Sequence, residues 1–250
     1  MCHSVGVSHR QKRARTLARH GELLVEVDPS RPSGRFLRQA DMDASYIDLA
    51  DVTHLEFDYM RWLRIVLRIA GARRVLHIGG GGCALARALA SEDPDGRHEV
   101  CEVDADVLAL AREHLGLRRQ PGLRVRHAEG RGHLATQRDG SWDAIVVDAF
   151  VGARVPERLI TAAALGDAAR VAPLTLINVV DNRAARDVHT VASAMTGAYP
   201  NVWTLGRRPG NTIVAGCASG AEPDIAHVAA RAAADATPAR LVRVAGQSAR

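Results

Sequence analysis

The chain has 250 residues, of which 47% are hydrophobic, and a formal net charge of +5 at pH 7. This length suits one large α/β domain with a small appendage, and the apolar fraction is sufficient for a buried core. No apolar run reaches the roughly 18 to 20 residues that a membrane helix needs, so we expect a cytoplasmic protein without a membrane partner. The four cysteines are far apart and form no CxxC pair, which indicates neither a zinc site nor a disulfide framework.

The basic excess is concentrated near the N-terminus, and we expect residues 1–20 to form a flexible basic tail. Such a tail can bind nucleic acid, but few aromatic residues interleave with it and no recognition-helix pattern follows. Because a run of charge is usually a solvated surface, we predict no nucleic-acid partner. The basic residues are Arg10, Lys12, Arg13, Arg15 and Arg19.

A small β unit is predicted over residues 21–52. Three short segments with strand-like alternation, separated by turn-forming residues, indicate a hairpin or meander. These segments are 22–27, 35–37 and 45–49.

A helix is predicted to open the next domain, which we place at residues 53–218. Thr53, with Glu56 three residues later, forms a capping-box pattern. The helix is expected to run to about Ala70, before a glycine ends it. Tyr59 lies on its apolar face.

Strands and helices alternate through the rest of this domain, which is typical of an α/β fold with a doubly wound, mostly parallel, Rossmann-like sheet. Strands are predicted at 74–78, 98–103, 123–127, 143–148, 173–180, 200–205 and 211–216, with helices between the first six.

The last two predicted strands are separated by a turn at residues 207–210, so we expect a terminal antiparallel hairpin at the sheet edge. That hairpin favours the S-adenosylmethionine-dependent methyltransferase type of sheet over the dehydrogenase type. Residues 219–250 are Ala-rich, with a helix predicted over 224–235 and a weak apolar run, 241–244, in a loosely attached end.

Glycine or carboxylate residues stand at the ends of four successive predicted strands. In a doubly wound sheet a ligand lies across these carboxyl ends, so together they predict a nucleotide site. Glu102 is expected to accept hydrogen bonds from ribose hydroxyls, Glu129 to lie near an adenine amino group, and Asp148 to face the reacting group. Asp104 is expected to cap the helix that follows it. The predicted nucleotide-binding residues are Gly79, Gly80, Gly81, Gly82, Glu102, Val103, Glu129 and Gly130.

Metal chemistry is not predicted. The 11 histidines show neither HExxH nor HxH spacing. His77, inside the first strand of the domain, is expected to be a packed or hydrogen-bonded core residue.

Several segments resemble motifs of the polyamine aminopropyltransferases, the spermidine synthase family. Residues 75–83, 101–104, 128–130 and 143–150 are similar to VLxIGGGDG, xEID, xDG and DxIxxDxxDP, and 55–59 is similar to EFxYxE. The resemblance covers about residues 20–216. It implies a methyltransferase-like Rossmann domain behind a small β domain, and assembly that we expect to be a homodimer. It also implies decarboxylated S-adenosylmethionine, S-adenosylmethionine or methylthioadenosine as the ligand, and a small-molecule amine as the acceptor.

The family's reaction assigns roles to individual residues. An amine nitrogen attacks the aminopropyl carbon next to a sulfonium, and a carboxylate accepts the amine proton. The resemblance implies that Asp148 is this general base, Glu102 the ribose-binding carboxylate and Glu129 the adenine-side acid. Tyr59 matches a substrate-pocket tyrosine; alternatively, it is a core residue of its helix.

The chain departs from the family's motifs where they carry acids for the amine. Gly82 replaces an Asp of the glycine loop, and Val151 replaces the second Asp of DxxDP. Each lost carboxylate removes a charge-assisted contact worth about 1.5 to 3 kcal/mol when desolvated. Met60 and Arg61 replace the polar end of EFxYxE, and an inward-pointing Arg61 would repel the amine.

Three hypotheses for function stay open. They are an aminopropyltransferase-like enzyme with altered acceptor specificity, an S-adenosylmethionine-dependent methyltransferase, and a non-catalytic relative with an eroded acceptor site. A nicotinamide dehydrogenase is a further alternative, since Gly79-x-Gly81-x-x-Ala84 fits the dinucleotide fingerprint. The terminal hairpin and Glu129 argue against it.

Overall fold

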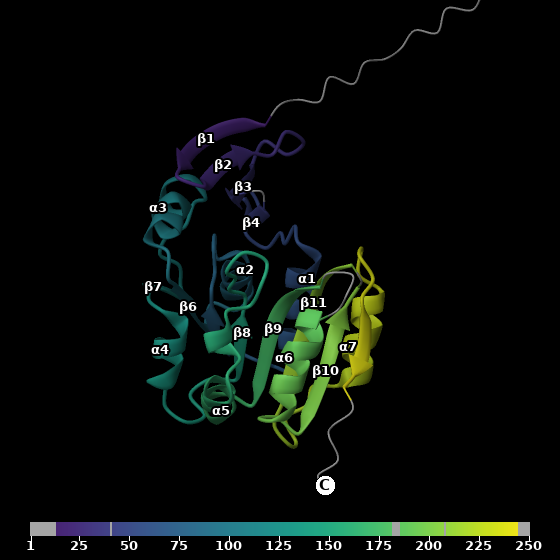
Figure 1. The fold of residues 1–250 in the computed structure, drawn as a ribbon. Coiled ribbons are helices and arrows are strands. Elements are labelled where there is room, and N and C mark those ends of the chain that lie inside the picture. Colours follow the sequence, from purple (N-terminus) through teal and green to yellow (C-terminus); the bar gives the residue numbers. More distant parts are fainter. Residues whose placement is uncertain (1–13, 41, 182–185, 208, 245–250) are drawn as a thin grey trace, which may run out of the picture.

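Two sheets organise the chain, a small N-terminal one and a large one with helices on both faces (Figure 1). The structure is a computed structural model that describes residues 14–40, 42–181, 186–207 and 209–244. Among the described residues, no helix has the length and apolar composition needed to cross a membrane.

The N-terminal sheet is an antiparallel meander of β1 (Arg15–His20), β2 (Leu23–Val27), β3 (Gly34–Gln39) and β4 (Met42–Asp48), paired in that order. One face is apolar and buried against the main domain through Leu23, Val25, Leu37 and Ile47. The predicted β unit is therefore present, with one more strand than expected.

Part of the predicted basic tail is structured. Residues 15–20 form β1, because their backbone pairs with β2 while the side chains of Arg15 and Arg19 stay exposed. A strand ladder uses main-chain groups, so charged residues do not prevent it. The prediction of a tail was wrong for these residues, and residues 1–13 lie outside the described part of the chain.

The main domain has the predicted α/β architecture. Its sheet has the order β12-β10-β11-β9-β8-β5-β6-β7, in which β9, β8, β5, β6 and β7 are parallel and β11 runs antiparallel to both β9 and β10. Its strands are β5 (Arg74–Ile78), β6 (Arg97–Glu102), β7 (Leu123–His127), β8 (Ala144–Val147), β9 (Leu174–Asp181), β10 (Asn201–Gly206), β11 (Gly210–Cys217) and β12 (Arg240–Arg243). Its helices are α1 (Asp58–Ile69), α2 (Ala84–Glu92), α3 (Ala105–His114), α4 (Gly130–Ala135), the 3-10 turn η1 (Glu157–Leu159), α5 (Ala162–Val171), α6 (Arg186–Thr196) and α7 (Ile225–Ala233).

The strand order reverses between β5 and β8, which places the topological switch point at the glycines that follow β5. Ligands of doubly wound sheets bind at such a point. The hairpin of β10 and β11 is present as predicted.

The hairpin is not the edge of the sheet, because β12 pairs with the outer side of β10. We expected residues 241–244 to be loosely attached; instead Leu241 pairs with Leu205, and Val244 donates a backbone hydrogen bond to Val202. An edge strand has unpaired N–H and C=O groups, and β12 satisfies those of β10.

The start of α1 also differs from the prediction. Thr53 does not cap it, since its backbone N–H and its hydroxyl both donate to Asp51 Oδ1, at 2.9 and 2.7 Å. The helix begins five residues later at Asp58, after Phe57, which makes no side-chain capping bond. Thr53, the N-cap residue that the capping-box pattern predicts, is therefore bonded to Asp51 instead of to the helix. Short polar side chains often make such local hydrogen bonds in competition with helix capping.

A buried histidine pair makes stability depend on pH. His77, expected in the core, is 4% exposed and lies 3.4 Å from His98 between the ring nitrogens. Burial lowers the pKa of His77 well below 6.5 and that of His98 to about 4. The unfolded chain therefore binds more protons below pH 6.5. Stability is fully present above that pH and falls as the pH drops towards 4.

For His98 alone we expect roughly 2 to 3 kcal/mol of unfolding free energy to be lost over this interval. Urea titrations between pH 7 and pH 4 measure it. His98→Gln should flatten the slope, because glutamine does not titrate. An equal slope in His98→Gln would contradict the assignment.

Gly216 of β11 is a packing constraint. A Cβ there would lie 2.5 Å from the Tyr199 ring and 2.7 Å from Met195 Cε. The Tyr199 ring cannot shift freely, since its hydroxyl lies 2.6 Å from the Thr175 hydroxyl in a buried hydrogen bond.

Gly216→Ala should therefore lower the unfolding free energy by about 1 to 3 kcal/mol through overpacking. Gly166→Ala, in α5 with nothing within 4 Å of the added carbon, should raise it by about 0.5 to 1 kcal/mol. Denaturant melts measure the unfolding free energy of the two variants. Equal values would show that a Cβ at position 216 is not overpacked.

Candidate functional site

The glycine loop after β5 lies directly against the end of β8. Gly79 has a φ of +81°, and a Cβ on it would be 2.3 Å from the backbone oxygen of Asp148. Its N–H donates to the Cys101 carbonyl at 2.9 Å. Only glycine combines this left-handed conformation with so close an approach. The loop and Asp148 are thereby held side by side.

Glu102, at the end of β6, holds the glycine loop from the other side. Its Oε2 accepts hydrogen bonds from the N–H groups of Gly80 and Gly81, at 3.1 and 3.0 Å, and its Oε1 accepts one from Asp104 N at 3.0 Å. The side chain is buried, whereas the next residue, Val103, is 57% exposed. Glu102 thus lies beside the loop, and its predicted contact with ribose hydroxyls stays a prediction.

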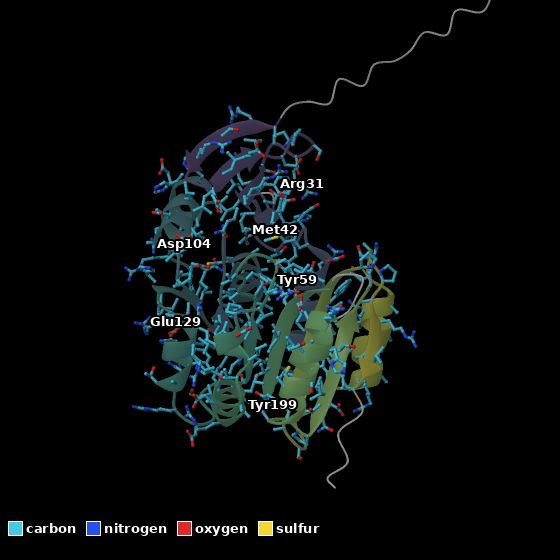
Figure 2. The ribbon with its side chains drawn as sticks, in the orientation of Figure 1. Arg31, Met42, Tyr59, Asp104, Glu129 and Tyr199 are labelled. Carbon is cyan, nitrogen blue, oxygen red and sulfur yellow. The ribbon has the colours of Figure 1, made fainter. Side chains whose placement is uncertain are left out.

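Asp148 is hydrogen-bonded to Tyr59, the residue for which the sequence allowed two interpretations. Tyr59 lies on the packed face of α1, 7% exposed, and its hydroxyl donates to Asp148 Oδ2 at 3.0 Å. It is therefore a packed residue of its helix that contacts the predicted base, and its predicted contact with a substrate stays a prediction. Figure 2 shows Tyr59 below the N-terminal sheet.

Burial sets the protonation behaviour of this pair. Burial raises the pKa of Asp148, although hydrogen bonds from Asn178 and Tyr59 act in the opposite direction. Burial and the neighbouring Asp148 charge raise the pKa of Tyr59 well above 10, so the phenol remains a neutral donor. The site combines a carboxylate of increased basicity with fixed donors.

Glu129 lies away from Tyr59 (Figure 2) and has structural contacts of its own. The Glu129 carboxylate caps α4 by accepting from Arg131 N at 3.0 Å and Gly132 N at 2.6 Å, and it pairs with Arg158 at 3.0 Å. Burial acts to raise the pKa of Glu129, but the hydrogen bonds from these donors outweigh it and the pKa is lowered. The predicted adenine contact stays a prediction.

Gly130 allows α4 to pack on β5, since a Cβ there would be 2.3 Å from Ile78 Cγ2. Asp104 caps α3 as predicted, by accepting from the N–H groups of Asp106 and Val107.

Arg61 does not point towards Asp148, so the expected repulsion of an amine does not arise from it. Its guanidinium makes hydrogen bonds to Asp235 at 3.0 to 3.2 Å and to Thr237 at 3.1 Å, which joins α1 to the segment after α7. The partner that holds this side chain is a carboxylate 174 residues away in sequence.

Gly82, where the resembling family has an acid, is packed against the N-terminal sheet. Its N–H donates to Ser45 Oγ at 3.1 Å, and a Cβ on it would lie 2.8 Å from that oxygen and 3.1 Å from Ile47 Cγ1. The N-terminal sheet therefore fills the space an acid would need. Val151, the other departure, is 66% exposed.

Ser45, Asn178 and Asn211 belong to the site and were absent from the prediction. Asn178 donates to Asp148 Oδ1 at 2.9 Å, and Asn211 donates to Asn178 Oδ1 at 3.0 Å. One signal for Asn178 exists in the sequence, because it is an amide in an otherwise apolar run of a buried parallel strand. Ser45 gives no such signal, since serine is common in exposed strands.

Metal ligands do not cluster in the described part of the chain, where no group of three or more His, Cys, Asp or Glu side chains could hold an ion.

Comparison with known proteins begins with sequence. No protein-family profile matches the chain. The polyamine aminopropyltransferase of Vibrio vulnificus (strain CMCP6) is 31% identical over 90 residues, which is 35% of this chain and 30% of that relative. The match thus spans less than a third of the curated relative's length.

Solved structures match much more of the chain. A probable spermidine synthase from Corynebacterium glutamicum ATCC 13032 is 25% identical with a TM-score of 0.79, over 93% of this chain and 91% of that one. A spermidine synthase in complex with the transition-state analogue AdoDATO has 16% identity and a TM-score of 0.63, over 86% and 76% of the two chains. Human methyltransferase-like protein 13 in complex with SAH has 15% identity and a TM-score of 0.57, over 69% and 87%. The predicted resemblance and the methyltransferase-type fold are confirmed.

The packing of Gly82 predicts that an acid cannot simply be restored there. Gly82→Asp should lower the unfolding free energy by about 1 to 3 kcal/mol, because the new side chain meets Ser45 and Ile47. Adding Ser45→Gly should recover part of that loss. Gly166→Asp, at an exposed glycine with nothing within 4 Å, is the matched control. Denaturant unfolding measures the free energy of unfolding of all three variants. If Gly82→Asp were as stable as Gly166→Asp, the result would contradict this packing.

Proposed function

We propose that this chain, a divergent spermidine synthase-like protein, binds an adenosyl sulfonium compound and transfers its aminopropyl group to an amine. Decarboxylated S-adenosylmethionine is the donor in this proposal, and a small-molecule amine is the acceptor. A cytoplasmic location and a homodimer belong to the same proposal.

The single observation that carries the proposal is the environment of Asp148. A half-buried carboxylate at the carboxyl end of β8 touches the glycine loop through its backbone and is held by Tyr59 and Asn178. A general base must lie within reach of the proton that it takes and must have a suitably raised basicity. Burial of Asp148 supplies that basicity.

The nucleotide half of the site supports the same proposal. Glu102 carries a negative charge beside the loop, where ribose hydroxyls would donate to it. Val103 offers an exposed apolar side chain at the same strand end, suited to contact with an adenine ring. The solved relatives that contain AdoDATO and SAH have the same fold.

The reaction follows from these positions. The neutral amine nitrogen forms a bond to the aminopropyl carbon while the bond from that carbon to sulfur breaks. The bonding electron pair stays on sulfur, which leaves as the thioether methylthioadenosine. The surplus proton on the new secondary amine passes to the Asp148 carboxylate. Tyr59 and Asn178 keep the two carboxylate oxygens in place during the transfer.

A methyltransferase using intact S-adenosylmethionine is the second candidate. One observation favours it: Gly82 and Val151 carry no charge at positions where the resembling family places acids for an amine. A methyl transfer does not need those acids. The two candidates differ in the ligand that binds, which makes them separable.

The test is calorimetry of the wild-type protein with decarboxylated S-adenosylmethionine, S-adenosylmethionine, methylthioadenosine and NADH. We expect the decarboxylated compound to bind and NADH not to bind. Glu102→Gln should weaken binding at least tenfold, about 1.4 kcal/mol, because it removes the charged acceptor. Glu113→Gln, at an exposed position of α3, is the control and should bind as the wild type does.

Turnover is measured as methylthioadenosine release with a panel of amines. Asp148→Asn should retain ligand binding and lose roughly 100-fold or more in rate, since the base is gone. Preference for intact S-adenosylmethionine would favour the methyltransferase. Absence of binding by every adenosyl compound would leave the non-catalytic alternative.

A further inference from the structure

A chain of side-chain hydrogen bonds crosses three strands and ends at the proposed base. Asn211 Nδ2 donates to Asn178 Oδ1 at 3.0 Å, Asn178 Nδ2 donates to Asp148 Oδ1 at 2.9 Å, and Tyr59 donates to Oδ2 at 3.0 Å. The four side chains come from β11, β9, the end of β8 and α1. No step of the proposed reaction needs Asn211, so its part in this chain requires another explanation.

The register of the strands accounts for the geometry. Val147 pairs with Ile177 in the parallel ladder of β8 and β9, so Asp148 and Asn178 are the next residues on adjacent strands. Asn178 pairs with Ile213 in the antiparallel ladder of β9 and β11. Asn211 is therefore the diagonal neighbour of Asn178 on the same face. The backbone ladders, rather than a flexible loop, set these positions.

The charge of Asp148 fixes which group donates and which accepts in each of these hydrogen bonds. An ionised carboxylate only accepts hydrogen bonds, so the nitrogen of the Asn178 amide must face Asp148. Its oxygen must then face Asn211, which has to supply a nitrogen. If Asn211 offered an acceptor instead, the Asn178 amide would rotate and turn its own oxygen towards the carboxylate. Asn178 is 1% exposed, so water cannot easily replace the lost donor.

We propose that Asn178 and Asn211 are positioning residues that hold the Asp148 carboxylate in its proton-accepting form and orientation. The inference rests on the proposed function, in which Asp148 accepts the acceptor's proton. Asn178 acts directly on Oδ1 of Asp148. Asn211 acts one residue further away, by deciding which end of the Asn178 amide the carboxylate meets.

Opposing influences act on the pKa of the Asp148 carboxyl. Burial and the Glu102 charge both favour the protonated form of Asp148, while Asn178 and Tyr59 favour the charged form. The titratable groups that act on Asp148 among the described residues are Glu102 and Tyr59. The hydrogen bonds of Asn178 and Asn211, here called the amide relay, therefore influence the pKa of Asp148 in a way that a neutral substitution can change.

Carbon-13 NMR of labelled aspartate in the full-length protein tests the proposal by following the titration of the Asp148 carboxyl. The Asp148 signal is identified by its loss in Asp148→Asn. Asn211→Asp should turn the Asn178 amide round and shift the titration midpoint upward by about one pH unit or more. Asn211→Leu, which removes the donor without adding charge, should shift it less and in the same direction.

Asn201→Asp is the matched control. Asn201 begins β10 and pairs with Cys217, at the opposite end of the strands from Asp148. The substitution adds the same charge but contacts neither Asn178 nor Asn211, so the Asp148 titration midpoint should not move. The acid limb of the pH profile for methylthioadenosine release should move with the NMR midpoint in each variant.

Unchanged midpoints in folded Asn211→Asp and Asn211→Leu would overturn the proposal. A shift in Asn201→Asp as large as that in Asn211→Asp would overturn it as well, because it would reduce the effect to net charge. The NMR titration does not depend on turnover. Failure of the proposed function would therefore appear as absent catalysis with the midpoint shift intact, and failure of this inference as catalysis without the shift.

Discussion

The close contact between the backbones of the glycine loop and the end of β8 is the constraint on which the rest of the site depends. Gly79 has no room for a side chain, because a Cβ on it would lie only 2.3 Å from the Asp148 carbonyl oxygen. This contact occurs at the switch point of the sheet, where the chain leaves β5 for one face and β8 belongs to the other half. It brings the glycine loop and the proposed base together without any side chain between them.

Two carboxylates flank this contact and are stabilised in different ways. Glu102 accepts from three backbone N–H groups, so its position follows from the paths of two loops. Asp148 accepts from side chains on α1 and β9, so its position depends on tertiary packing. Desolvation raises the pKa of Asp148, and the Glu102 charge acts in the same direction. One acid therefore holds the loop and also increases the basicity of the other.

Sequence patterns were informative wherever local signals and tertiary structure agreed. β5 was predicted with its observed bounds, and the glycines after it required a tight turn whatever the rest of the chain did. Predictions were wrong where a distant residue intervened. Thr53 lost its capping role to Asp51, and Arg61 turned towards Asp235. β12 formed because β10 had a free edge, which no feature of residues 240–243 by themselves reveals.

The missed site residues have the same explanation. Asn178 and Asn211, which lie 33 positions apart in sequence, become neighbours only through the antiparallel register of β9 and β11. Ser45 reaches Gly82 because the N-terminal sheet packs on the glycine loop. A pattern along the chain can identify the loop, but not the element that covers it.

The departures at Gly82 and Arg61 bear on whether the site is eroded. Deleting a side chain from a packed region leaves a cavity, and turning a charge inwards leaves it unpaired, and both are destabilising. Neither is observed. The space beside Gly82 is occupied by Ser45 and Ile47, and Arg61 has a carboxylate partner. Residues from the N-terminal sheet and from the segment after α7 complement the two changes, as expected for a site with a different acceptor end. Asp148 meanwhile keeps donors on both oxygens, which a non-catalytic scaffold would not require. Together these contacts favour a working site with altered acceptor specificity over an eroded one.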